Sequence, residues 1–92
     1  MRALPEDLRP YKRTPEFGET TIPKGLLRRH STKADVWGRI RILEGTLRYR
    51  ILEPEVEEVV LSPDKPGVVE PAVPHEVEPM GPVRFYVEFL RR

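Results

Sequence analysis

Runs in which apolar and polar residues alternate fill the middle of the chain. Ile40 and Ile42 alternate with arginines, and after Glu44-Gly45 the same alternation resumes through Tyr49. Because side chains two residues apart share one face of a strand, each run predicts a strand with an apolar face and a cationic face. Gly45 can adopt the positive φ of a tight turn, so the pattern predicts a β-hairpin with arms at 36–43 and 46–52.

Similar short runs, separated by proline and glycine, continue along the rest of the chain. With 11 prolines and six glycines, helices of ordinary length are not expected. Residues 1–10 form a polar lead-in, and Pro15 marks the first strand as an edge strand because proline cannot donate to a ladder. The predicted strands are 11–17, 25–30, 36–43, 46–52, 56–61, 68–70, 75–77 and 83–90. About eight strands without helices predict an all-β fold, and the number suits a double-sheet jelly roll.

The composition limits the class of protein. A chain of 92 residues is expected to form one domain, residues 1–92, with a single core. Its net charge of +1 gives no overall field to attract nucleic acid or an anionic membrane. No apolar run approaches the roughly 20 residues of a spanning helix, and the first ten residues lack the apolar segment of a secretion signal. With no cysteine, disulfides and thiolate chemistry are excluded, and a cytoplasmic location is expected.

The two histidines are the candidates for metal binding. Imidazole is a common ligand of Zn, Fe, Ni and Cu, and two imidazoles with one carboxylate can form a three-ligand face with open positions. We therefore expect His30 and His75 to bind a metal with Glu88 of the last strand, with Glu44 and Glu70 as alternatives. The competing interpretation is that either histidine only forms hydrogen bonds at the end of a strand.

The sequence around these histidines resembles a known family. The segments TIPKGLLRRHSTKADVWGRIRILEGTLRYRILEP, PGVVEPAVPHEV and VRFYVEF are similar to the small TehB/YeaR-like cupin family, a tellurite-resistance-associated domain of unknown function. The resemblance extends from about Leu4 to Phe89. It implies a cupin-like double-stranded β-helix, a jelly-roll barrel with a divalent metal at its mouth. Of the four usual ligand positions only His30 and His75 have counterparts, and Gly38 stands where the family has a glutamate.

Aromatic and arginine side chains have two interpretations each. The aromatics could line a ligand pocket, with the Tyr86 hydroxyl at its mouth, but in so small a domain most are expected to form the core. The arginines could bind an oxyanion, yet nearby glutamates favour cross-strand ion pairs on a solvated face. The aromatics concerned are Trp37, Tyr49, Phe85 and Phe89; the charged residues are Arg28, Arg29, Arg39, Arg41, Arg48 and Arg50 with Glu53, Glu55, Glu57 and Glu58.

Together these patterns predict a small cupin-like protein that binds a divalent metal (Zn, Ni, Fe or Mn) through His30, His75 and Glu88. Small-molecule or oxyanion binding, in stress or tellurite-related chemistry, is the expected activity, and the resemblance implies a homodimer. One alternative is a metal-free interaction module that pairs with another chain through the edge strand 11–17 or the predicted hairpin. A metal-dependent enzyme, such as a dioxygenase or isomerase, is the third possibility. Nucleic-acid and membrane partners are not expected.

Overall fold

The computed structural model describes all of residues 1–92 and consists mainly of strands, so the all-β prediction is confirmed. The strands are β1 (Arg9–Arg13), β2 (Phe17–Gly18), β3 (Trp37–Ile51), β4 (Glu57–Leu61), β5 (Gly67–Val69) and β6 (His75–Arg91), and the only helix is the 3₁₀ turn η1 (Lys24–Leu27). None of its helical structure has the length and apolar character needed to cross a membrane.

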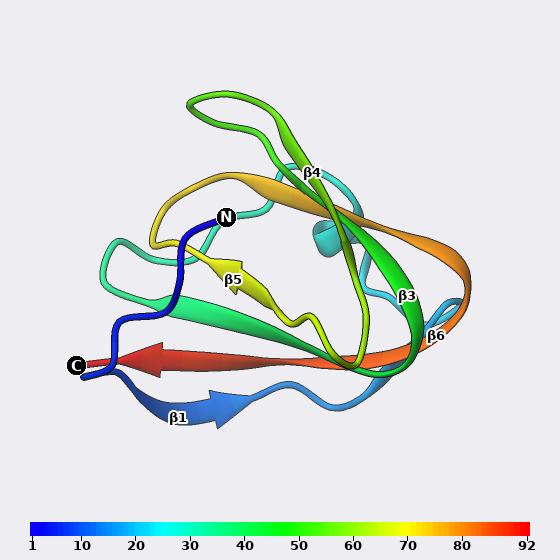
Figure 1. Cartoon of the computed structure of the whole chain (residues 1–92), viewed down its shortest axis with the longest axis horizontal. Coiled ribbons are helices and arrows are strands. Elements are labelled where there is room, and N and C mark those ends of the chain that lie inside the picture. The colour runs from blue at the N-terminus through cyan, green and yellow to red at the C-terminus, as the bar shows by residue number, and fades with distance from the viewer.

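The two longest strands organise the sheet. β3 and β6 run antiparallel beside each other, from the pair Trp37 and Leu90 to the pair Ile51 and His75. The strand order is β1-β6-β3-β4, and the short strands β2 and β5 add to β6 and β3 respectively. In Figure 1, β3 and β6 lie side by side and curve together, with β1 along the C-terminal part of β6. β1 is therefore an edge strand, as predicted for residues 11–17, although Pro15 itself lies between β1 and β2.

The predicted β-hairpin is wrong. Residues 36–43 and 46–52 do not pair with each other, because both belong to β3 and pair with β6. Gly45 does have a positive φ of 79°, but it serves a bend in a continuous strand where the register with β6 shifts. A Cβ on Gly45 would lie 2.1 Å from the Pro82 carbonyl oxygen. A glycine of this kind suits a bulge as well as a turn, so the local sequence could not distinguish them.

Two other segments also differ from the prediction. Residues 25–30 are not a strand: they include most of η1, whose first turn is closed by the Leu26 amide donating to the Pro23 carbonyl at 2.9 Å. The predicted strand 11–17 is divided between β1 and β2. Because β3 and β6 each combine two predicted segments, the structure has six strands rather than about eight.

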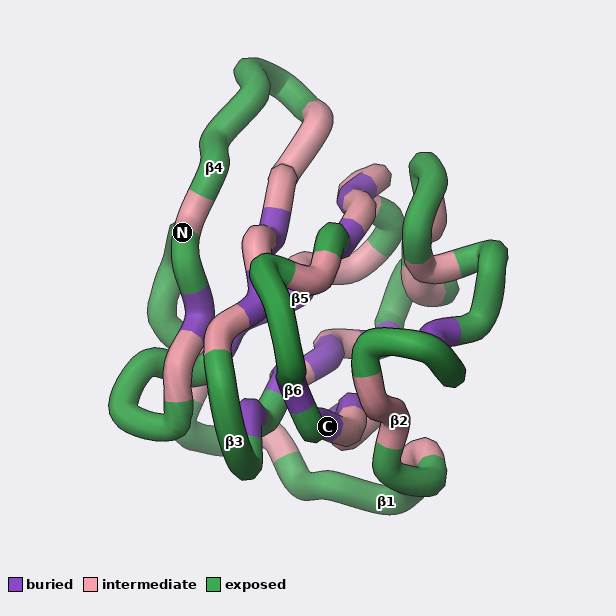
Figure 2. Tube along the Cα trace, turned by 90° about the vertical axis from the view of Figure 1, so that its right-hand side faces the viewer, coloured by how far each residue is buried: buried purple, intermediate pink, exposed green.

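The curved sheet encloses one apolar core. Ile40 and Phe85, from one half of the β3–β6 pair, belong to the same buried cluster as Leu47, Tyr49 and Val77 from the other half. The inner faces of the two halves therefore pack together. Figure 2 shows buried segments toward the interior and exposed segments at the loops and outer strands. Tyr49 and Phe85 are buried as predicted, whereas Trp37 and Phe89 are half-buried.

The outer face of β3 carries ion pairs. Arg39 Nε lies 2.8 Å from Glu88 Oε1, and Arg48 Nε lies 3.0 Å from Glu58 Oε1. Arg50 also pairs across the sheet, at 2.6 Å from a carboxylate oxygen of β6. These contacts confirm that three strand arginines form cross-strand ion pairs, although Arg41 forms none and Glu58 is the only one of these partners that the sequence predicted.

Candidate functional site

The two histidines meet at the start of β6. The His30 amide donates to the His75 carbonyl and the His75 amide donates to the His30 carbonyl, each at 2.7 Å. On its other side, His75 faces Ile51 at the end of β3. The centroids of the two imidazoles are 5.4 Å apart and the ring planes cross at 82°. The fold therefore brings together two side chains that lie far apart in the sequence.

The His75 ring is buried and has a defined hydrogen-bond partner. It is 4% exposed, with the Tyr49 ring centroid 5.8 Å away. Its Nδ1 lies 3.2 Å from the Val73 carbonyl oxygen. Because a carbonyl only accepts, this contact requires the proton on Nδ1 and leaves the lone pair on Nε2. Burial, and to a lesser extent His30, lower the pKa of His75, which favours the neutral form needed for metal binding.

The His30 ring has an unsatisfied nitrogen. Its Nδ1 is buried and has no hydrogen-bond partner in the protein. A buried polar atom in this state loses its hydration without a compensating bond, and such atoms in folded proteins usually have a partner or a functional role. A bound ion or a water molecule would remove this cost. Both histidines therefore offer a ring nitrogen that the protein itself does not use.

A small internal cavity lies beside the two rings. Its volume is about 30 Å³, and its lining comprises the two imidazoles, two threonines and seven hydrophobic side chains. One water needs about 10–15 Å³ measured in this way, so the space suits an ion or one to two waters. Pockets for organic ligands are about 300–1,000 Å³, so a substrate does not fit in this cavity as it stands.

The predicted carboxylate ligands do not join the histidines. The inward residues of β6 are Val83, Phe85 and Val87, so Glu88 is on the opposite face, where it binds Arg39 at 2.8 Å. No group of three or more His, Cys, Asp or Glu side chains is arranged to hold a metal ion. The alternation of the last strand already indicated that Glu88 points away from the core, because it places Glu88 out of phase with the apolar residues.

The two alternative carboxylates also have other partners. Glu44 lies 3.3 Å from Arg84, and Glu70 lies 3.3 Å from Arg2. The Tyr86 hydroxyl is not at the histidines either: its ring is on the outer face of β6, with the Arg13 guanidinium 4.1 Å from its centroid.

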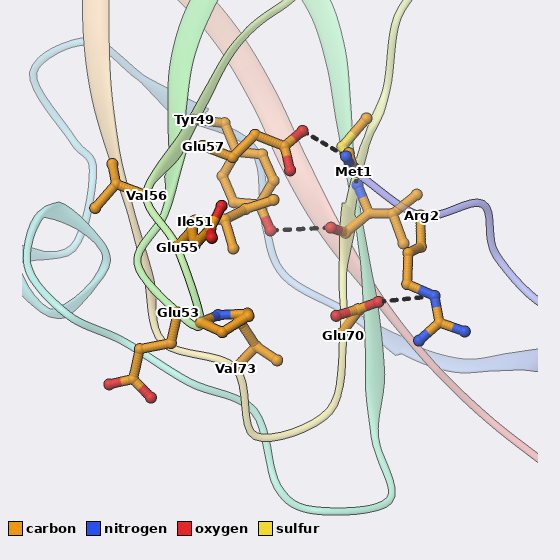
Figure 3. A pocket seen from close by; sticks show the side chains of 12 residues that line it. Met1, Arg2, Tyr49, Ile51, Glu53, Glu55, Val56, Glu57, Glu70 and Val73 are labelled. Atoms are coloured by element: carbon orange, nitrogen blue, oxygen red, sulfur yellow. Dashed lines mark hydrogen bonds and ion pairs between the residues drawn. The ribbon is translucent and has the colours of Figure 1, made fainter.

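A larger hollow, of about 420 Å³, is lined in part by Tyr49, the residue whose ring also contacts His75. Figure 3 shows the Glu57 carboxylate directed at the Met1 amino group and the Glu70 carboxylate directed at Arg2. The Tyr49 hydroxyl donates to the Val68 carbonyl at 2.9 Å. Burial, together with Glu70 and Glu57, raises the pKa of Tyr49 well above its ordinary value, so the hydroxyl remains a donor that ties β3 to β5. The sequence analysis missed this hollow because it forms from segments that are distant in the chain.

The fold and the site define a class: a small antiparallel β protein with a contacting pair of histidines, the buried His75 and the half-buried His30, where its longest strand begins. A family model described as the TehB-like domain matches residues 12–87, so the chain belongs to the TehB-like domain family. The resemblance found in the sequence is thereby confirmed.

Solved structures share this fold. The crystal structure of TehB from Haemophilus influenzae superposes with a TM-score of 0.86 at 26% identity, covering 95% of this chain and 32% of that chain. A protein from E. coli strain K12 superposes with a TM-score of 0.87 at 22% identity, covering 98% of this chain and 96% of that one. The chain thus spans about a third of the length of the Haemophilus protein. No curated protein matches the chain in sequence.

Proposed function

We propose that this chain is a cupin-like jelly-roll protein that binds a divalent metal ion between His30 and His75 and thereby binds a small molecule or an oxyanion. The contact between the two imidazoles is the observation that carries the proposal. Their ring centroids are 5.4 Å apart beside a cavity, which is close enough for one ion to contact both rings after small rotations. Membership of the TehB-like family, with the association with tellurite resistance that the resemblance implies, supports an oxyanion among the ligands.

The chemistry of the two rings suits a metal. A histidine that binds a metal through one ring nitrogen usually donates a hydrogen bond from the N–H of the other to a carbonyl or carboxylate, which fixes the tautomer. His75 has this arrangement with Val73, and the unpartnered Nδ1 of His30 is available as the second donor. Imidazole donors fit Zn, Ni and Fe best, while Mn prefers more oxygen ligands.

With two protein ligands, the remaining positions would hold water or the bound molecule. A metal held by His30 and His75 would supply Lewis-acid polarisation of an oxygen of that molecule. The protein's own contribution is to orient the rings and to exclude bulk water with its apolar lining. The cavity of about 30 Å³ favours binding of one small group over turnover of a larger substrate.

Thermal unfolding with and without metal tests the proposal. Protein purified without a His tag is titrated with Zn²⁺, Ni²⁺, Mn²⁺ and Fe²⁺. A ligand that binds only the folded state stabilises it by about 2.7 kcal/mol at 100 times its Kd, so the melting temperature should rise with metal concentration. His30→Gln and His75→Gln should each abolish the rise, whereas Glu88→Gln should retain it. The same rise in both histidine variants as in the wild type would reject the proposal.

A second candidate, a metal-free homodimer, has support at the other edge of the sheet. β4 is an edge strand; Val56, just before it, is 66% exposed and Val60, within it, is 48% exposed. Free strand edges with apolar side chains can pair with a second copy. Sedimentation of metal-free protein distinguishes the candidates: a dimer that Val60→Lys dissociates supports this alternative, and a monomer at high concentration removes it.

A further inference from the structure

A second hollow lies on the outer side of His30. Its volume is about 260 Å³, and His30, Thr32 and Phe89 line both this hollow and the internal cavity. The remaining lining residues come from β1 and from the loop before β3. A molecule in this hollow would therefore lie next to the histidine pair.

The charge in this hollow is positive and not neutralised. Lys12 and Lys33 line it, no carboxylate does, and neither lysine takes part in an ion pair. Arg91 adds a third positive charge nearby, because its guanidinium stacks on the Tyr11 ring at 3.9 Å. Three arginines of β3 differ, since Arg39, Arg48 and Arg50 all bind glutamates.

The loop that carries Lys33 is held in place. The Thr32 hydroxyl donates to the Val36 carbonyl at 2.7 Å, and the Val36 amide donates to the Lys33 carbonyl at 3.1 Å. The exposed Ser31 hydroxyl also lines the hollow and is free to donate. Ordering of a binding loop before the ligand arrives lowers the entropic cost of binding.

Part of the lining is apolar. Tyr11, Val36 and Phe89 contribute hydrophobic surface to the same hollow as the charged groups. Pockets for small organic ligands are mostly apolar with a few polar groups that fix orientation, and their volumes begin at about 300 Å³. The hollow, at about 260 Å³, is therefore sized for a small ligand.

We infer that this hollow binds a small organic anion, with its carboxylate at Lys12, Lys33 and Ser31 and its apolar part against Val36 and Phe89. This site is additional to the metal site and does not depend on it. Binding in metal-free protein is therefore the critical measurement, and failure of the metal proposal would leave it untouched.

A titration with benzoate, followed by amide ¹H–¹⁵N NMR in EDTA, tests the inference. A ligand of this size is expected to bind with a Kd on the order of 1 mM. Saturable shifts should concentrate at Lys12, residues 31–36 and Phe89. The inference is overturned if no shift saturates at about 20 times that concentration or if the shifts occur mainly elsewhere.

Matched lysine variants separate this site from general charge. The double variant Lys12→Ala/Lys33→Ala should weaken benzoate binding about three- to ten-fold, because exposed charge contacts are individually modest. Lys24→Ala/Lys65→Ala removes two other exposed lysines that do not line the hollow and should leave the Kd unchanged. Equal weakening by the two double variants would refute the site.

Two further probes test the two halves of the ligand. Inorganic phosphate keeps the negative charge without an apolar part, and benzamide keeps the ring without the charge. Both should bind more weakly than benzoate. If phosphate binds as tightly as benzoate, the apolar residues do not contribute to binding. If benzamide binds as tightly as benzoate, the lysines do not contribute, and either result contradicts the proposed contacts.

Discussion

Protonation of His75 is coupled to folding, because the buried ring is more difficult to charge than the same ring in the unfolded chain. Its pKa is lowered in the folded protein from the ordinary value of 6.5. Below about pH 6.5 the unfolded chain thus binds more protons than the folded one. The contribution of this residue to stability is complete above that pH and decreases as the pH falls.

Urea unfolding between pH 7.5 and 5.5 measures this effect. We expect the free energy of unfolding of metal-free protein to fall toward pH 5.5, by at most about 1.4 kcal/mol per pH unit for one group. His75→Gln should remove most of this slope. A ring proton titration of His75 by NMR provides an independent measurement, and a pKa at or above 6.5 would contradict the proposed burial effect.

Gly45 is the residue that permits the bend in β3. Its φ is 79°, and a Cβ would clash with the Pro82 carbonyl oxygen at 2.1 Å. Gly45→Ala should lower the free energy of unfolding by about 3 kcal/mol or more, since it combines an unfavourable φ with a backbone clash. Gly81 has a φ of 118° but open space around it, so Gly81→Ala should cost about 1–2 kcal/mol. Equal losses in chemical denaturation would show that the clash is relieved without cost.

At the scale of single residues, the sequence predicted burial better than it predicted partners. Of the four aromatics expected in the core, Tyr49 and Phe85 are buried and Trp37 and Phe89 are half-buried. The alternation of the last strand places Glu88 on the outer face, so its expected role beside the histidines conflicted with information already in the sequence. No local signal indicated that Lys12 and Lys33 approach the same hollow.

At the scale of elements, the outer face of the sheet is stabilised by charge pairs of limited strength. Arg39 and Glu88 join β3 to β6 and are 27% and 17% exposed. A partly shielded ion pair contributes more to the free energy of unfolding than a fully exposed one, whose contribution is about 0–1 kcal/mol. Neither Arg39 nor Glu88 lines the histidine cavity, because Glu88 lies on the opposite face of β6.

Glu88→Gln tests both the strength of this ion pair and its separation from the histidine site. It should lower the free energy of unfolding by about 1 kcal/mol, because it removes one partner of a half-buried pair. Stability measured as a function of salt should fall less in this variant than in the wild type. A loss of metal affinity in Glu88→Gln, measured by calorimetry, would instead show that this carboxylate contributes to metal binding.

The arrangement of elements could be predicted only in part. Strand periodicity identified most of β3 and β6, since alternation is a local property. Pairing is not local: whether Gly45 turns the chain back or bends a continuous strand depends on the partner that lies beside it. In this chain β6 pairs with the whole of β3 and decides the outcome.

At the scale of the whole molecule, the curvature of β3 and β6 creates the site. It encloses the core and delivers His75 to His30, while η1 and the segment after it bring His30 to the sheet. The sequence could suggest this meeting only through the resemblance to a family, because no spacing rule links two residues so far apart. That contact is the basis of the proposed metal site.

The most direct test of a shared ion is the ¹⁵N NMR spectrum of the two imidazoles during a Zn²⁺ titration. If both rings bind the same ion, one nitrogen of His30 and one of His75 will shift together and reach their end points at one equivalent of metal. Nδ1 of His75 should retain the signature of a protonated nitrogen, because it donates to Val73. If only one ring shifts, or the rings respond at different metal concentrations, the two histidines do not share an ion.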